Sequence, residues 1–261
     1  MEPRKKVTLS YILEKKANGE KLARTALYDY PMAVLAEEAG IEIINMGDSI
    51  ATVMLGHKTT NEADLDIMIE HAKAVRAGTP SAFIMGDMPF LTYQISDEEA
   101  IRNAGRYIRE AGMDCVKIEG GMEIVHTVEA LTKAGIPVIA HTGLTPQKAL
   151  QMGGYKTQGR DMLAAVELIK EVAAFEKAGA IAVVIEAIPS EVAKIFYIFA
   201  GSATLERLFH RRNLGLFMVL TGVCLLCLAL MSDFGTALIF FATFLVIAYL
   251  RSGDFATLSL I

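Results

Sequence analysis

Short apolar segments alternate with amphipathic ones along this chain, from residue 24 to about residue 195. Such alternation predicts strands followed by helices. The predicted strands span residues 24–28, 41–46, 82–85, 115–118, 137–140 and 181–185. The predicted helices span residues 31–39, 64–77, 97–111, 123–134 and 161–178. Repeated strand–helix order requires a parallel sheet, so we expect an α/β fold: an incomplete (β/α)8 TIM-type barrel of about six β/α units.

Acidic residues stand at the ends of three of these strands. Asp48 and Ser49 follow the second strand after Gly47, Asp87 follows the third, and Glu119 follows the fourth. The carboxyl ends of parallel strands meet at one edge, where α/β folds place their chemistry. Three carboxylates there predict an oxygen-lined site suited to Mg²⁺. The structural alternative is that each acid caps the helix that follows it.

Other polar residues belong to the same strand ends. Lys117 and Glu119 are two residues apart on one strand, so their side chains point to the same face, and Lys117 is placed to neutralise a substrate carboxylate. His141 follows the fifth strand and Glu186 the sixth. A lone histidine or glutamate at such a place is more often structural, and their position at successive strand ends makes them candidates.

Composition limits the classes of function. The 261 residues carry a formal net charge of −5, which gives no reason to expect a nucleic acid as partner. With three cysteines no disulfide framework is expected, and a reducing, cytoplasmic setting is the default. The basic start of the chain has no apolar run behind it, so we expect no signal peptide.

The sequence resembles the ketopantoate hydroxymethyltransferase family over about residues 7–195. The matching motifs are Tyr28-Asp-Tyr30, Met46-Gly-Asp-Ser49, Gly86-Asp-Met-Pro-Phe90, Val116-Lys-Ile-Glu-Gly-Gly121, His141-Thr-Gly-Leu-Thr-Pro-Gln147, Gly153-Gly-Tyr-Lys-Thr-Gln-Gly-Arg160 and Val184-Ile-Glu-Ala-Ile-Pro189. Several long motifs in the right order make the resemblance specific. Thr60-Asn-Glu-Ala63 departs from the Thr-Leu-Pro-Val that is usual in the family.

The resemblance implies an activity and a role for each candidate residue. It implies transfer of a hydroxymethyl group from 5,10-methylenetetrahydrofolate to 3-methyl-2-oxobutanoate, in the synthesis of pantothenate and coenzyme A, by a homo-oligomer. The implied ligands of Mg²⁺ are Asp48, Asp87 and Glu119. The implied contacts of the keto acid are Asp48, Ser49, Asp87 and Lys117. Glu186 would be the base that deprotonates the substrate, and His141 would orient Glu186.

The character of the chain changes near residue 196. Residues 214–231 and 234–250 contain no charged side chain, and a bilayer core of about 30 Å is crossed by helices of about this length. We expect a domain at 1–195 and a membrane hairpin within 196–261, rather than two buried helices. Basic residues at both outer ends, including Arg212 and Arg251, predict that these ends face the cytoplasm.

The C-terminal part, residues 197–261, resembles a fragment of the SEDS family of cell-wall polymerases around Asp233-Phe-Gly-Thr-Ala237. The motifs of the seventh and eighth barrel strands do not occur, and no linker precedes residue 197, which indicates a chimeric reading frame. Three hypotheses follow: a Mg²⁺-dependent hydroxymethyltransferase, an inactive membrane-anchored protein, or another 2-keto acid carbon–carbon bond enzyme on the same site.

Overall fold

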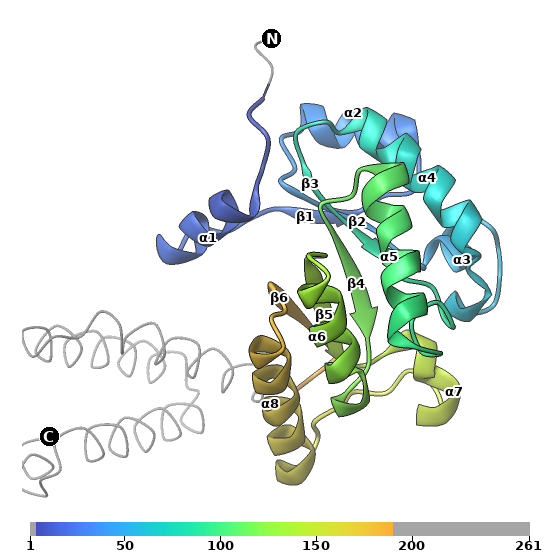
Figure 1. The fold of residues 1–261 in the computed structure, drawn as a ribbon, viewed down its shortest axis with the longest axis vertical. Coiled ribbons are helices and arrows are strands. Elements are labelled where there is room, and N and C mark those ends of the chain that lie inside the picture. The colour runs from blue at the N-terminus through green and yellow to red at the C-terminus, as the bar shows by residue number, and fades with distance from the viewer. Residues whose placement is uncertain (1–3, 190–261) are drawn as a thin grey trace, which may run out of the picture. The chain divides into compact units, whose positions relative to one another are not determined.

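The computed structural model describes residues 4–189, which fold around a parallel sheet (Figure 1). Its six strands pair in sequence order, β1-β2-β3-β4-β5-β6. The strands are β1 (Arg24–Ala26), β2 (Ile43–Met46), β3 (Phe83–Asp87), β4 (Cys115–Glu119), β5 (Val138–Gly143) and β6 (Ala182–Glu186). The α-helices are α1 (Leu9–Ala17), α2 (Tyr30–Glu38), α3 (Ile50–Val53), α4 (Leu65–Gly78), α5 (Asp97–Ala111), α6 (Val125–Lys133), α7 (Ala149–Met152) and α8 (Met162–Lys177). Three 3₁₀ turns complete the order: η1 (Thr60–Glu62), η2 (Met122–Ile124) and η3 (Pro146–Lys148).

The predicted strands and helices are confirmed, with ends that differ by a few residues. β5 continues through His141 to Gly143: His141 pairs with both β4 and β6, and Thr142 and Gly143 pair with β6. Three helices were not predicted from the sequence: α1 and the single-turn helices α3 and α7. Thr8 caps the N-terminus of α1, and its side chain accepts a hydrogen bond from the Tyr11 backbone N–H.

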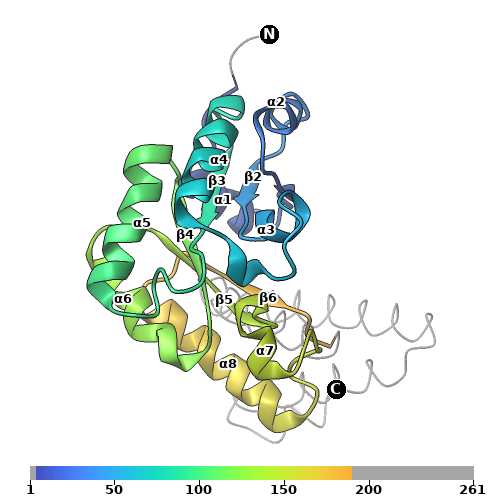
Figure 2. The same ribbon diagram turned by 90° about the vertical axis from the view of Figure 1, so that its right-hand side faces the viewer.

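The two faces of the sheet carry different cores. One face packs against α2, α4, α5, α6 and α8 (Figures 1 and 2), and the larger apolar core lies there. Because side chains alternate along a strand, Ile84 belongs to this core while Phe83 and Met85 belong to the other face. On that other face, Val7 and residues of α1 pack against Phe83, Met85, Cys115 and Ile139.

The strands form an open half-barrel in the described part of the chain, because β1 and β6 stand at the two edges of the sheet. The fold class is therefore the predicted parallel α/β class, with six units. Within residues 4–189 no helix has both the length and the apolar character needed to cross a bilayer. The predicted membrane segments, 214–231 and 234–250, lie outside the described residues.

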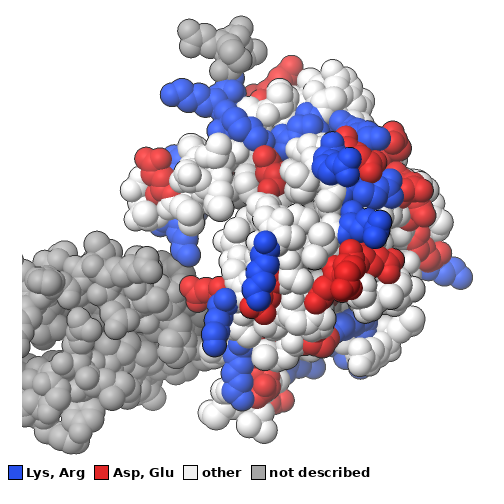
Figure 3. Space-filling model, viewed as in Figure 1, with Lys and Arg blue, Asp and Glu red and all other residues white. Residues whose placement is uncertain are grey.

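Charged side chains of both signs are interspersed over the face of the molecule seen in Figure 3. The described residues also form ion pairs along single helices, such as Arg106 with Glu110 on α5 and Lys170 with Glu167 on α8. Exposed pairs at this spacing contribute little to stability, on the order of 0.3–0.5 kcal/mol each.

One close contact fixes the end of β3. A Cβ on Gly86 would lie 2.6 Å from Cδ1 and 2.8 Å from Cε1 of the Tyr107 ring, so only glycine fits. Tyr107 is fully buried on α5, and its hydroxyl donates a hydrogen bond of 2.7 Å to the backbone oxygen of Asp87. The ring cannot move away without losing that bond, and the bond holds the carboxyl end of the strand against the helix.

We expect Gly86→Ala to lower the free energy of unfolding by about 1–3 kcal/mol, because the methyl group overlaps a fixed ring. Gly105→Ala on α5 is the matched control: nothing lies within 4 Å of its added Cβ. That change should be neutral or stabilise the helix by up to about 1 kcal/mol. Urea unfolding of both variants makes the measurement, and equal effects would contradict the packing argument.

Candidate active site

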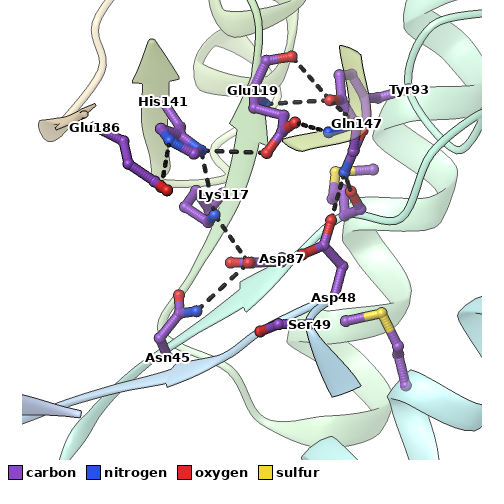
Figure 4. A network of polar contacts seen from close by, with 12 residues as sticks. Asn45, Asp48, Ser49, Asp87, Tyr93, Lys117, Glu119, His141, Gln147 and Glu186 are labelled. Atoms are coloured by element: carbon purple, nitrogen blue, oxygen red, sulfur yellow. Dashed lines mark hydrogen bonds and ion pairs between the residues drawn. The ribbon is translucent and has the colours of Figure 1, made fainter. Parts of the chain in front are cut away.

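The residues singled out in the sequence lie together at one edge of the sheet (Figure 4). Asp87, Glu119 and Glu186 end β3, β4 and β6, His141 lies within β5, and Asp48 follows β2. Asp48, Asp87, Lys117, Glu119 and His141 are all less than 10% exposed. Parallel pairing in consecutive register produces this gathering, since each strand delivers its last residues to the same edge.

Lys117 and Asp87 form a buried ion pair, with Nζ 2.8 Å from Oδ2. Asn45 also donates to Asp87 Oδ2, at 3.4 Å, whereas Asp87 Oδ1 is buried and has no partner among the described residues. Burial lowers the pKa of Lys117, but the charges of Asp87 and Asp48 outweigh it, so the net pKa is raised. Lys117 therefore stays protonated and is the cation that offsets these two acids.

The surroundings of Asp48 disfavour its ionised form. Burial, together with the nearby charge of Asp87, raises its pKa to about 7. One oxygen, Oδ2, accepts a hydrogen bond of 2.8 Å from Nε2 of Gln147. The neighbouring Ser49 hydroxyl lies 2.8 Å from the hydroxyl of Tyr28. Asp48 thus lies where a cation would relieve a carboxylate that the protein alone does not fully stabilise.

His141 stands between two glutamates. Its Nδ1 lies 3.2 Å from Oε2 of Glu119, and its Nε2 lies 3.1 Å from Oε2 of Glu186. The second contact is an ion-pair distance rather than an in-line hydrogen bond. Burial lowers the pKa of His141, but its contacts with both glutamates outweigh burial and raise it overall. The same contact with His141 lowers the pKa of Glu186, which favours its ionised form.

Three further polar residues belong to this network and were given no role from sequence: Asn45, Tyr93 and Gln147. Gln147 closes the motif that starts at His141, but a neutral amide gives no charge signal. The Tyr93 hydroxyl donates to the Glu119 backbone oxygen at 2.9 Å and lies 2.8 Å from Gln147 Oε1. A role for Asn45 could have been suggested only by its position on the second strand, close to Asp48 and Asp87.

The three predicted metal ligands do not form a ready-made site in this arrangement. In the part of the chain that the structure describes, no group of three or more His, Cys, Asp or Glu side chains is placed to hold a metal ion. Asp87 instead contacts Lys117, Asp48 contacts Gln147, and Glu119 contacts both Gln147 and His141. The ligand set therefore stays a prediction.

Comparison with known proteins identifies the family. The model of the ketopantoate hydroxymethyltransferase family matches residues 6–197. The chain belongs to this family. It is 47% identical over 190 residues to the 3-methyl-2-oxobutanoate hydroxymethyltransferase of Ignicoccus hospitalis, covering 73% of this chain and 72% of that one. The enzyme of the same name from Syntrophomonas wolfei is 47% identical over 72% of this chain and 68% of its own. The resemblance of residues 197–261 to the SEDS family stays a prediction, and these residues lie outside the described part of the chain.

Solved structures show the same fold at low sequence identity. The crystal structure of 2,3-dimethylmalate lyase, a member of the PEP mutase/isocitrate lyase superfamily, superposes with a TM-score of 0.55 at 23% identity. The match covers 75% of this chain and 70% of the lyase chain. Phosphonopyruvate hydrolase in complex with oxalate and Mg²⁺ gives 0.54 at 20% identity. This chain spans 63% of the hydrolase length.

Lys117→Met should lower the free energy of unfolding by about 3–5 kcal/mol, because it leaves the buried carboxylate of Asp87 without its cation. The double variant Lys117→Met/Asp87→Asn should recover part of this loss. Lys133→Met, which removes an exposed pair with Glu129 on α6, is the control and should change stability by about 0.5 kcal/mol at most. Equal losses for Lys117→Met and Lys133→Met in chemical unfolding would show that the buried pair is not needed.

Proposed function

We propose that this chain transfers a hydroxymethyl group from 5,10-methylenetetrahydrofolate to 3-methyl-2-oxobutanoate, giving 2-dehydropantoate, in a reaction that needs Mg²⁺. Membership of the family supports the reaction, since the relatives at 47% identity bear the name of that enzyme. The observation that carries the proposal is the gathering of Asp48, Asp87, Lys117, Glu119 and Glu186 at one edge of the sheet. This set combines acids for a divalent cation, a cation for a carboxylate and a base.

The donor set fits Mg²⁺. Oxygen ligands from carboxylates are those that Mg²⁺ prefers. Asp87 Oδ1 is buried and has no hydrogen-bond partner within residues 4–189, and the pKa of Asp48 is raised to about 7 by burial and by Asp87. A cation beside these two acids would relieve both. We assign Asp48, Asp87 and Glu119 to hold it, and when bound it would act as a Lewis acid that polarises the keto group.

The protein's own groups account for substrate binding. The protonated ammonium of Lys117 offers a partner for the substrate carboxylate, and burial strengthens that attraction because water is excluded. The hydroxyl of Ser49 is held by Tyr28 and offers a further hydrogen bond to the keto acid. Asp48 and Asp87 line the same place, so the keto acid would lie over the ends of β2, β3 and β4.

Glu186 is the proposed general base. Its pKa is lowered by His141, so it is ionised at neutral pH and ready to accept a proton. It would take the proton from C3 of the substrate, and His141 would hold the carboxylate that receives it. The electron pair left at C3 forms the new bond to the one-carbon unit. The methylene carbon that bridges two nitrogens of the folate becomes the new hydroxymethyl group, so both of its carbon–nitrogen bonds break. Water supplies the hydroxyl oxygen, and the two nitrogens take up one proton from that water and the one held by Glu186.

The division of the chain is part of the proposal. Residues 1–195 are the enzyme-like domain, which agrees with a family match that ends at residue 197. On the basis of sequence alone, we keep residues 214–231 and 234–250 as a membrane hairpin. The enzyme-like domain would then lie on the cytoplasmic side. We expect it to be a homo-oligomer, as the family implies. Fractionation of cells that express the full chain tests the hairpin separately from the chemistry.

Glu186→Gln should abolish the Mg²⁺-dependent exchange of the C3 hydrogen of 3-methyl-2-oxobutanoate with solvent deuterium, because the amide cannot accept the proton. Proton NMR of the substrate in D₂O makes the measurement without the folate. Glu167→Gln on α8, an exposed acid of the same chemistry, is the control and should exchange at the rate of the unaltered chain.

Exchange at an unchanged rate in Glu186→Gln would remove Glu186 from the role of base. Exchange by the unaltered chain without formation of 2-dehydropantoate when 5,10-methylenetetrahydrofolate is added would favour a different 2-keto acid reaction. Absence of both exchange and product from a folded chain would favour the inactive membrane-anchored protein.

A further inference from the structure

Gln147 connects the ends of three strands although it belongs to none of them. It lies in η3, after β5, and is 5% exposed. From there its side chain reaches across the carboxyl edge of the sheet to the loops that follow β2 and β3 (Figure 4). A buried amide with this reach orders several segments at once.

The side chain uses both of its polar groups. Nε2 donates to Asp48 Oδ2 at 2.8 Å and to the backbone oxygen of Met88 at 3.0 Å. Oε1 accepts from Nε2 of Gln94 at 3.2 Å and lies 2.8 Å from the Tyr93 hydroxyl. The carbonyl of Met88 can only accept, so the NH₂ group must face Asp48 and the amide cannot be reversed.

The backbone of Gln147 adds a separate contact. Its N–H donates to Glu119 Oε1 at 2.6 Å, and its carbonyl oxygen accepts from Nδ2 of Asn61 at 3.0 Å. One residue therefore binds the carboxylates of both Asp48 and Glu119. Among the described residues, the Gln147 amide is the hydrogen-bond donor to the Asp48 carboxylate.

We propose that Gln147 is a positioning residue that fixes the Asp48 and Glu119 carboxylates in the orientation needed for a divalent cation. The inference rests on the proposed function, which supplies the cation. Asp48 and Glu119 are both buried acids, and Gln147 donates a hydrogen bond to each of them. Gln147 occupies one oxygen of each and sets the direction of the other. Outer partners of this kind typically account for 10–100-fold in metal affinity.

The test is the affinity of the metal-free full chain for Mn²⁺, measured by the EPR signal of free Mn²⁺ in a titration. Gln147→Met keeps the length of the side chain and the backbone N–H. It removes the side-chain contacts with Asp48, Met88, Tyr93 and Gln94 and leaves the backbone bond to Glu119. We expect Mn²⁺ affinity to fall about 10–100-fold. In the exchange assay, the concentration of Mg²⁺ needed for half-maximal rate should rise by a similar factor, with less change in the rate at saturating Mg²⁺.

Gln151→Met is the matched control, because Gln151 is an exposed glutamine on α7, close by in sequence. It should bind Mn²⁺ as the unaltered chain does. Tyr93→Phe is the milder variant, to be used if Gln147→Met does not fold: it removes the hydroxyl that bonds Gln147 Oε1 and should weaken Mn²⁺ binding severalfold.

Asp48→Asn separates failure of this inference from failure of the proposed function. If Asp48→Asn loses Mn²⁺ binding while folded Gln147→Met retains the affinity of the unaltered chain, the metal site stands and the role of Gln147 is wrong. The same holds if Tyr93→Phe is the folded variant and its affinity is unchanged. If the unaltered chain and Asp48→Asn bind Mn²⁺ equally, the metal site itself is wrong, and the inference falls with it.

Discussion

Carboxylates that repel one another at the carboxyl edge of a parallel sheet are the constraint on which the rest of this site depends. Asp48, Asp87 and Glu119 are each about 5% exposed or less, so water does little to separate their charges. Three neighbours offset these charges: Lys117 lies beside Asp87, His141 beside Glu119 and the side-chain amide of Gln147 beside Asp48. The raised pKa of Asp48 shows that this compensation is incomplete. An incompletely neutralised group of acids is a place that attracts a cation.

The parallel sheet brings these groups together at the carboxyl ends of its strands. Strand pairing in consecutive order delivers Asp87, Glu119 and Glu186 to the same end of the sheet, and the helices packed on one of its faces (α2, α4, α5, α6 and α8) hold the strands in register. Tyr107 reinforces β3 through its bond to the Asp87 backbone, at a point where Gly86 leaves room for the ring. Stability and chemistry are therefore coupled at the strand ends, since the contacts that fix the backbone also fix the acids.

Sequence predicted the parts of this structure that depend on local pattern. Apolar periodicity predicted all six strands. The acids that follow these strands could be grouped in one site, because the carboxyl ends of parallel strands lie together. Gln147 and Tyr93 could not be found in this way, because neutral polar residues have no periodic or charge pattern. The partner of Gln147, Asp48, is 99 residues away, so only the tertiary fold brings the pair together. α1 was not predicted for a related reason: it packs against Phe83, Met85, Cys115 and Ile139, which are distant from it in sequence.

The central claim is that acids from separate strands converge on one divalent cation that holds a keto acid. Anomalous diffraction from crystals of the full chain, grown with Mn²⁺ and 3-methyl-2-oxobutanoate, tests it most directly. The account predicts one strong anomalous peak within bonding distance of oxygens from Asp48, Asp87 and Glu119, with the keto acid on the same ion and its C3 facing Glu186. A peak away from these side chains, or a keto acid bound with its C3 remote from Glu186, would contradict it.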